Sequence, residues 1–310
     1  EEQYNNRYTN VPPLVPRYLR RPAVGRLDRR GRELTPLSLD DVRDAIELFK
    51  KESVEAVAIC FMNAFANSEH EVRAAELVAA ELPGAYLTAS SDLLPSVRFY
   101  NRLSSTVLNA YNGPKLSTYL DSLTRRLADI GFDGVLLIMQ SNGGVVLPAT
   151  ARKSAAMTLL SGPAAGPVAG LEYARIHGTD NCLTVDMGGT SFDAAMVLNG
   201  APIAATEGDI NRYRIALPML DIVTIGAGGG SIGWIDEGGL LRMGPQSAGA
   251  DPGPACYGRG GGLPTCTDAD LVLGYLDPRY FAGGRIALDR DAAKLVIEHH
   301  IARPMGLSIE

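Results

Sequence analysis

The stretch LTVDMGGTSFD, residues 183–193, constrains the fold of this chain more than any other part of the sequence. An apolar run ends in a carboxylate, two glycines and two hydroxyls follow, and a second carboxylate leads into another apolar run. These polar and glycine positions are Asp186, Gly188, Gly189, Thr190, Ser191 and Asp193. Glycines can adopt positive φ and expose backbone N–H groups, so together with the hydroxyls they predict a cradle for a phosphate. The two carboxylates are then free to hold a hydrated Mg²⁺.

The residues after the glycines separate two kinds of nucleotide site. In a dinucleotide-binding turn or a P-loop, the glycines open a helix whose N-terminus faces the phosphates. Here they open a strand, because residues 194–198 are followed by Asn199-Gly200, a hairpin signal, and by 201–205. The pattern predicts three antiparallel strands, with a phosphate-sized first turn and Asp186 at the end of the first strand. A plain hairpin with a tight glycine turn is the alternative, and it leaves the hydroxyls and carboxylates unexplained.

Composition narrows the class of protein. A chain of 310 residues with 46% hydrophobic content is long enough for one large or two ordinary domains with real cores. The net charge of −6 argues against a nucleic-acid partner. The four cysteines form no Cys-x-x-Cys pair, which fits a reducing cytoplasm, and no apolar span approaches the length needed to cross a membrane. We therefore expect a cytoplasmic protein without nucleic-acid or membrane partners.

The first half of the chain alternates between helical and strand patterns, which is typical of an α/β fold. Capping pairs, Ser38 with Asp41 and Ser68 with Glu71, predict the starts of two helices, and His70 is expected at the surface of the second. Gly113-Pro114 is expected to end a helix before another begins. The expected strands are 54–61, 85–89 and 134–139. The first expected helix follows Ser38 and has Val42, Ala45, Ile46 and Phe49 on one face, and the others are 69–82, 93–112 and 115–130.

Two segments near the phosphate turn add candidate ligand contacts. Small residues fill 161–170 and predict a helix that crosses between two lobes and packs closely against the strand that ends in Asp186. Ser161 and Gly162 are expected near a nucleotide cleft, and a Gly/Pro loop before an ordinary helix is the alternative. A strand at 222–225 runs into glycines whose uncovered N–H groups form a second candidate anion nest. This predicted nest spans Gly226–Gly230 beside Ser231, and Gly228, Gly229 and Gly230 are its candidate nucleotide contacts.

Two carboxylates further along the chain have two interpretations each. Asp268 and Asp270 are placed to help bind a metal or a ribose, or equally to cap a helix that begins near Ala269. The sequence leaves this alternative open.

Several longer sequence motifs resemble motifs of one known family and occur in the same order. A helix of small residues comes first, and a strand, the motif Asp-x-Gly-Gly-Thr and a hairpin follow it. This arrangement is similar to the second phosphate element of the actin, sugar kinase and heat-shock chaperone superfamily. Within it, the chain resembles the hydantoinase A / 5-oxoprolinase family, which includes acetone and acetophenone carboxylase subunits. The matching words are QSNGG (140–144), LSGPAAG (160–166), DMGGTS (186–191), GAGGGS (226–231), GPQSAG (244–249), PGPACYG (252–258) and TCTDAD (265–270).

The resemblance implies an α/β, actin-like ATPase fold with ribonuclease H-like lobes and mixed sheets. It further implies ATP and Mg²⁺ as cofactors, and Asp186 and Asp193 as catalytic and metal-binding residues. The partners it implies are a hydantoinase B-type subunit or domain, in a hetero-oligomer of the full-length protein, and a small cyclic amide substrate. The nucleotide-binding residues it implies are Gly188, Gly189, Thr190, Ser191, Ser161, Gly162, Gly228, Gly229 and Gly230.

Two family elements are missing, a first Asp-x-Gly-Gly-Thr element and a later Phe-Gly-Gly-Ala-Gly-Pro loop. We therefore expect an incomplete pair of lobes, with 1–98 as the remainder of the N-terminal hydantoinase/oxoprolinase lobe and 99–310 as a hydantoinase A-type ATPase lobe truncated at its C-terminus. Because phosphoryl transfer needs donors on both sides of the triphosphate, the isolated chain is expected to bind ATP weakly and to lack substrate-dependent turnover.

The resemblance implies activation of a cyclic amide (hydantoin, 5-oxoproline or a lactam) by phosphorylation before ring-opening hydrolysis. One alternative is a carboxylase subunit of the acetone or acetophenone type. Another is a nucleotide-dependent scaffold without catalysis, since fold alone does not fix function.

Overall fold

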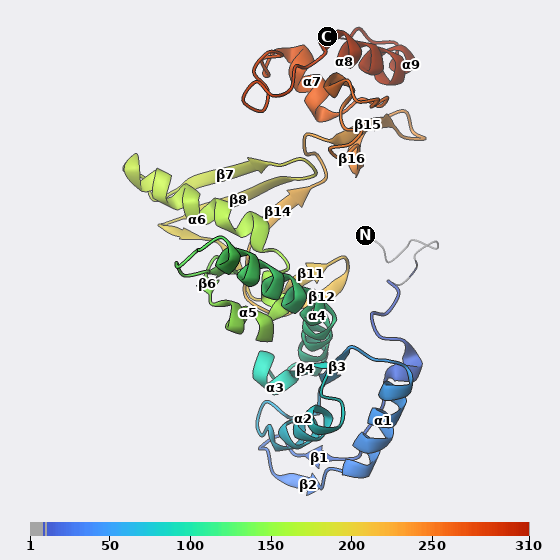
Figure 1. Cartoon of the computed structure of the whole chain (residues 1–310), viewed down its shortest axis with the longest axis vertical. Coiled ribbons are helices and arrows are strands. Elements are labelled where there is room, and N and C mark those ends of the chain that lie inside the picture. Colours follow the sequence, from blue (N-terminus) through green and yellow to red (C-terminus); the bar gives the residue numbers. More distant parts are fainter. Residues whose placement is uncertain (1–8, 10, 310) are drawn as a thin grey trace. The chain divides into compact units, whose positions relative to one another are not determined.

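The computed structural model describes residue 9 and residues 11–309, and the chain divides into two compact units (Figure 1). The first unit comprises Glu1–Ala165 and Ala204–Leu220, and the second comprises Gly166–Ile203 and Asp221–Glu310. The beginning of the expected first region, residues 1–8 and residue 10, lies outside the described residues. Each unit mixes helices and strands, as the α/β pattern predicts.

The first unit is built on a β-α-β arrangement of two parallel strands and the helix between them. Its elements are η2 (Arg17–Leu19), β1 (Arg26–Leu27), β2 (Glu33–Thr35), α1 (Leu39–Lys51), β3 (Ala56–Ile59), α2 (Glu69–Glu81), β4 (Tyr86–Ala89), α3 (Ser90–Leu93), α4 (Phe99–Asp129), β5 (Ile138–Met139), β6 (Val145–Val146), α5 (Pro148–Lys153), η3 (Ala155–Thr158), β10 (Ala204–Ala205), β11 (Gly208–Ile210), β12 (Tyr213–Ile215) and β13 (Met219–Leu220).

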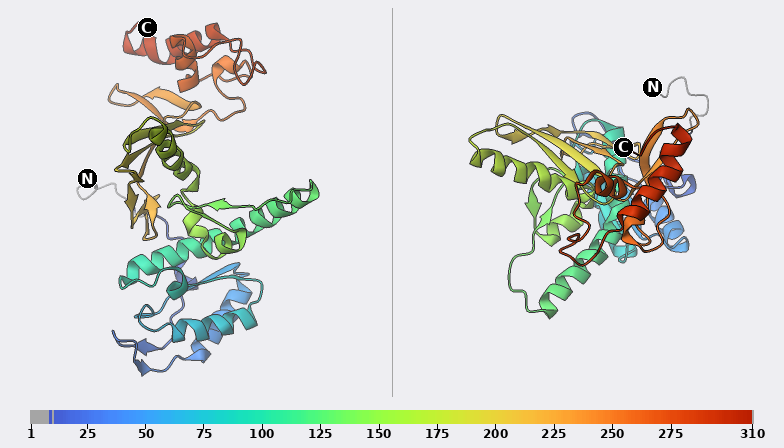
Figure 2. Two further views of the ribbon diagram at one scale, coloured as in Figure 1. Left: turned by 90° about the vertical axis from the view of Figure 1, so that its left-hand side faces the viewer. Right: turned by 90° about the horizontal axis from the view of Figure 1, so that it is seen from above.

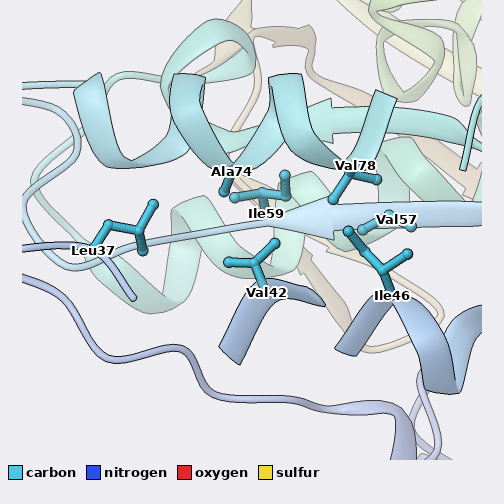
Figure 3. Packing of buried hydrophobic residues seen from close by; sticks show 7 residues of the cluster. All are labelled: Leu37, Val42, Ile46, Val57, Ile59, Ala74 and Val78. Carbon is cyan, nitrogen blue, oxygen red and sulfur yellow. The ribbon is translucent and has the colours of Figure 1, made fainter. Parts of the chain in front are cut away.

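The core of this unit forms where α1 and α2 pack against β3 (Figure 3). The side chain of Ser38 accepts the backbone N–H of Asp41 at 3.3 Å, which caps α1 as predicted. One helical turn then separates Val42 from Ile46, so both point at the strand. The buried apolar side chains of this cluster are Leu37, Val42, Ile46, Val57, Ile59, Ala74 and Val78.

The start of α2 differs from the prediction, because neighbouring segments cover it. His70, expected at the surface, is only 1% exposed, and its Nε2 lies 2.8 Å from a carboxylate oxygen of Glu33. Glu71 does not close a capping box. Its buried carboxylate accepts the N–H of Phe61 at 2.7 Å and the hydroxyl of Ser90 at 2.6 Å. Both side chains therefore join α2 to segments distant in sequence, which local pattern does not reveal.

Gly113-Pro114 does not end a helix, because α4 continues through it from Phe99 to Asp129. Proline removes one backbone donor, but tertiary packing holds the two halves together. A Cβ at Gly113 would lie against the ring of Tyr86, so the glycine lets β4 approach the helix closely. An ion pair of 2.5 Å between Asp121 and Arg152 ties the second half of α4 to α5.

The expected strand at 134–139 forms only at its end, as β5. β5 pairs antiparallel with β6, and the N–H of Gln140 donates to the carbonyl of Gly144 at 2.8 Å. The 140–144 loop is therefore the turn of a hairpin between β5 and β6.

The second unit contains a small antiparallel sheet and a helical C-terminal part (Figures 1 and 2). Helix α6 begins in the first unit and continues into the second. The elements are α6 (Ser161–Ile176), β7 (Cys182–Met187), β8 (Phe192–Leu198), β9 (Ala201–Pro202), β14 (Ile222–Ile225), β15 (Ser231–Ile235), β16 (Leu241–Ser247), η4 (Ala255–Tyr257), α7 (Cys266–Leu273), α8 (Arg290–Ile297), η5 (Glu298–Ala302) and α9 (Arg303–Met305).

Strand β8 is the centre of this sheet, paired antiparallel with β7 on one side and with β14 and β9 on the other. The β7, β8, β9 order confirms the predicted meander. The predicted third strand splits, because β10 joins a sheet in the first unit. Helix α6 lies along the sheet, and a Cβ at Gly170 would lie 2.2 Å from Thr184 Cγ2, which confirms the predicted close packing against β7 (Figures 1 and 2). Within the described residues, no helix has the length and apolarity that a membrane crossing requires.

Candidate functional site

The turn between β7 and β8 is the tight antiparallel connection that the sequence predicts. Met187 pairs with Phe192, and the N–H of Gly188 donates to the carbonyl of Ser191 at 2.9 Å. Strand β8 begins at Phe192, so no helix follows the glycines. The backbone of Gly188, Gly189 and Thr190 therefore forms the tip of a hairpin.

The two glycines of this turn leave space beside the backbone. Neither adopts the positive φ that the sequence led us to expect. A Cβ at Gly188 would meet only the carbonyl of Ser191, at 3.8 Å, and a Cβ at Gly189 would meet nothing within 4 Å. In the part of the chain that the structure describes, the N–H groups of Gly189 and Thr190 have no hydrogen-bond acceptor. The packing of the chain itself thus gives no reason for glycine at these positions.

The segment 226–230, which we term the brace loop, supports the turn through backbone hydrogen bonds. The N–H of Gly229 donates to the carbonyl of Gly188 at 2.9 Å, and that of Gly230 donates to the carbonyl of Gly189 at 2.7 Å. A Cβ at Gly228 would lie 2.5 Å from the backbone nitrogen of Ser191. The predicted second nest of uncovered N–H groups is therefore wrong for Gly229 and Gly230, because the turn already uses their donors. Close backbone approach explains these glycines.

Asp186 and Asp193 lie directly opposite each other on β7 and β8. Side chains at such positions share one face of a sheet, with Cβ atoms about 4.5–5.5 Å apart. Asp193 accepts the hydroxyl of Thr224 at 2.5 Å and that of Ser191 at 2.9 Å. The exposed carboxylate of Asp186 has no hydrogen-bond or ion-pair partner among the described residues. Asp193 is thus fixed in place, and Asp186 is free to bind a ligand.

The two carboxylates suit Mg²⁺ better than a cation that needs a protein cage. Among the described residues, no group of three or more His, Cys, Asp and Glu side chains converges on one point. Mg²⁺ keeps several of its waters and is commonly held by one or two carboxylates together with substrate phosphates. The Asp186 and Asp193 pair fits that requirement.

A cavity of about 460 Å³ in the second unit adjoins the turn. Its lining residues are Met187, Gly188, Gly189, Thr190, Gly229, Gly230, Gly249, Ala250, Pro254, Tyr257, Thr267, Asp270, Leu276 and Phe281. Five of the predicted site residues meet there, namely the three at the tip of the turn and two of the brace loop. The other predicted residues of this unit, Asp186, Ser191, Asp193 and Gly228, do not line the cavity. Ser161 and Gly162 belong to the first unit, where their proximity to the turn stays a prediction.

Helix α7 distinguishes the two carboxylates whose roles the sequence left open. Asp268 is fully buried and forms a capping box with Thr265, and it also accepts the N–H of Cys256 at 2.8 Å. Asp268 is therefore structural. Asp270 lines the cavity, and burial raises the pKa of its carboxyl above the ordinary value.

The sequence analysis gave no individual site role to eight of the lining residues, among them Tyr257, Thr267, Leu276 and Phe281. Tyr257 and Thr267 do lie in two of the motifs that carry the family resemblance. The spacing of three between Thr267 and Asp270, on a helix that starts next to the brace loop, was an available signal. The contact of Tyr257 with Phe281 joins residues far apart in sequence, so no local pattern indicates it.

The fold defines a mixed α/β protein with a glycine hairpin beside a cavity. The Hydantoinase/oxoprolinase family model matches residues 102–310, and the model of the Hydantoinase/oxoprolinase N-terminal region matches residues 1–82. The chain belongs to the hydantoinase/oxoprolinase family.

Relatives with known activities cover nearly all of the chain. It is 43% identical over 308 residues to the caprolactamase subunit alpha of Pseudomonas jessenii, a match that covers 99% of this chain and 44% of that protein. The crystal structure of that ATP-dependent caprolactamase superposes with a TM-score of 0.80, covering 99% of this chain and 45% of the other. The nucleotide-free structure of an ATP-dependent acetone carboxylase superposes with a TM-score of 0.82 at 31% identity, covering 98% and 43%. The chain thus spans less than half the length of these relatives.

Proposed function

We propose that this chain is the ATP-binding portion of an ATP-dependent cyclic-amide hydrolase, which activates its substrate by phosphorylation before the ring is opened. Its similarity to the caprolactamase subunit alpha, at 43% identity, supports the substrate class. The ATP dependence of that enzyme supports the cofactor. In this proposal the two units belong to the lobes of an actin-like ATPase.

The observation that carries the proposal is the open glycine turn. Glycine at 188 and 189 is required neither by positive φ nor by neighbouring atoms, since a Cβ at Gly189 meets nothing within 4 Å. The adjacent N–H groups of Gly189 and Thr190 have no acceptor in the described part of the chain. A ligand that approaches the backbone closely and accepts those hydrogen bonds accounts for both facts, and phosphate oxygens do so.

The side chains around the turn have complementary roles in this proposal. Asp186 and Asp193 hold Mg²⁺, which supplies positive charge to the phosphate oxygens when it is bound. The turn donates its free N–H groups to the phosphates, and the Thr190 hydroxyl adds a further donor. The Ser191 hydroxyl donates to Asp193 and so holds that carboxylate in place. The brace loop keeps these donors fixed, so little reorganisation accompanies the reaction. We include Ser161 and Gly162, at the start of α6, as further phosphate contacts.

Phosphorylation overcomes the low electrophilicity of a cyclic amide. The amide carbonyl is a poor electrophile, and transfer of the γ-phosphoryl group to its oxygen makes the attached carbon more electrophilic. Water then adds to that carbon, and the ring C–N bond breaks as the nitrogen takes up a proton. A second water releases phosphate from the resulting acyl phosphate, and we assign these water steps to a hydantoinase B-type partner subunit. Because the chain spans under half the length of its relatives, this activity belongs to the whole protein.

A second candidate function is the ATP-dependent carboxylation of a ketone, favoured by the similarity to acetone carboxylase at a TM-score of 0.82. The phosphate site would be used in the same way, with an enol oxygen as the acceptor. Substrate dependence therefore separates the two functions.

The experiment measures ADP release by the full-length protein in its native assembly. Caprolactam, 5-oxoproline and hydantoin are compared with acetone plus bicarbonate, each at saturating ATP. We expect a cyclic amide to raise ADP release at least tenfold, and acetone to have no effect. Stimulation by acetone and bicarbonate alone would establish the carboxylase alternative, and no stimulation by any of them would contradict both.

A further inference from the structure

The cavity beside the turn has two chemically different sides. One side is polar and consists of the turn, the brace loop, and Thr267 and Asp270 of α7. The other side is apolar, and we term it the aromatic wall: Pro254, Tyr257, Leu276 and Phe281. The rings of Tyr257 and Phe281 lie 5.6 Å apart between centroids and are tilted by 41°. The cavity therefore suits a small ligand with an apolar body and a polar end.

Asp270 is the charged side chain of this cavity, and it is placed by the contacts of α7. Thr267, one helical turn earlier, donates its hydroxyl to the carbonyl of Gly229 at 2.8 Å, which fixes that face of α7 against the brace loop. Asp270 lies on the same face. Its carboxylate has no hydrogen-bond or ion-pair partner among the described residues, whereas Asp268 is fully satisfied by its cap contacts. The cavity thus holds a carboxylate that lacks a donor.

A cyclic amide has both the apolar body that suits the aromatic wall and the N–H donor that Asp270 lacks. Its methylene ring is apolar, its N–H is a donor, and its carbonyl oxygen is the atom that phosphorylation requires. When this oxygen bonds to the γ-phosphorus, the bond from phosphorus to the leaving ADP oxygen breaks. The nitrogen must then lose its proton, so that the N–H electron pair forms the C=N bond of a neutral phosphorylated imidate. A base within reach of the N–H therefore assists the transfer.

We propose that the cavity binds the cyclic amide, with its ring against the aromatic wall and its N–H donated to Asp270, which takes the proton as the amide oxygen is phosphorylated. The inference rests on the proposed function. It adds the binding subsite of the acceptor and a catalytic base for the first step. Burial disfavours the charged form of this carboxyl and raises its pKa, which brings it closer to the working pH of a general base.

The test compares Asp270→Asn with Asp291→Asn in the full-length protein in its native assembly. Asp291 is an exposed acid in the first turn of α8, so its replacement removes the same charge away from the cavity. We expect Asp270→Asn to lower kcat for caprolactam at least about 100-fold. We expect it to leave the Kd of ATP unchanged and to remove the acidic limb of the pH profile. Asp291→Asn should match the wild type in all three measurements.

A binding measurement gives a readout that does not depend on turnover. With a non-hydrolysable ATP analogue present, the wild type should bind caprolactam more tightly than N-methylcaprolactam, which has no N–H. Asp270→Asn should lose this preference. Leu276→Ala, which shortens the aromatic wall, should raise the KM for caprolactam about tenfold without changing that for ATP.

Two results would overturn the inference. If Asp270→Asn or Leu276→Ala weakened ATP binding and left caprolactam unaffected, the cavity would hold the nucleotide. If neither variant changed any parameter, the cavity would have no role in the reaction. Either result is compatible with normal wild-type turnover of a cyclic amide, so it would leave the proposed function intact. The absence of such turnover in the wild type would instead contradict the proposed function.

Discussion

Two groups of glycines in the second unit perform opposite tasks. Gly228 and Gly230 are required by the protein's own packing, because added Cβ atoms would lie 2.5 Å and 2.9 Å from their nearest neighbours. Gly188 and Gly189 face open space. From the sequence alone, both groups of glycines are predicted to be anion nests, because each is simply a run of glycines. Only the hydrogen bonds from the brace loop to the turn separate the supporting glycines from those available to a ligand.

Asp270 should cost the protein stability at neutral pH. Burial raises the pKa of its carboxyl above the ordinary value of 3.8, so the folded state binds this proton more tightly than the unfolded state does. Stability from this group is fully present below pH 3.8 and is lost as the pH rises through the folded-state pKa. We expect Asp270→Asn to raise Tm at pH 7, by a margin that shrinks towards pH 4. A lower Tm for the variant at pH 7 would show that the carboxylate has a stabilising partner.

At the scale of elements, local patterns predicted what local interactions determine. The cap at Ser38 and the hairpin at Asn199-Gly200 lie where the sequence indicated, because capping and turn geometry depend on a few neighbouring residues. The predictions fail where contacts between segments distant in sequence determine the structure. His70 is buried against Glu33, and Gly113-Pro114 is held inside α4 by contacts to β4 and α5.

The candidate site shows the same division. The turn at 188–190 and the cross-strand carboxylates follow from the pattern of a single hairpin. The cavity needs five segments: the turn, the brace loop, residues 249–257, α7 and residues 276–281. No periodicity relates Tyr257 to Phe281, so the aromatic wall was beyond prediction from sequence.

Helix α6 contains a matched pair of glycines that tests its packing on β7. A Cβ at Gly170 would lie 2.2 Å from Thr184 Cγ2, and Thr184 is held by its hydroxyl bond to the carbonyl of Ala195 at 3.1 Å. We expect Gly170→Ala to destabilise the protein by about 1–3 kcal/mol. Gly166 lies one turn earlier with nothing within 4 Å of its Cβ, so Gly166→Ala should be neutral or stabilise by up to about 1 kcal/mol. Urea unfolding measures both, and equal effects would contradict close packing at Gly170.

At the scale of the whole molecule, a chain that spans under half the length of its relatives holds the whole glycine turn that we propose binds phosphate, with its supporting loop and an adjoining cavity. All the contacts that fix this element lie within the second unit. Binding of the ATP phosphates at the open glycine turn, as we propose it, therefore involves only a few residues and does not depend on the arrangement of the two units.

The most direct test is the ATP affinity of the full-length protein with a methyl group added at Gly189, measured by calorimetry. Gly189→Ala fills the space beside the free N–H groups. Hydrogen bonds to charged groups contribute about 1.5–3 kcal/mol, so the Kd of ATP should rise about 10- to 100-fold while Tm stays unchanged. Gly84→Ala is the control, since its Cβ in the first unit also meets nothing within 4 Å, and it should change neither quantity. Wild-type ATP affinity in Gly189→Ala would contradict the account.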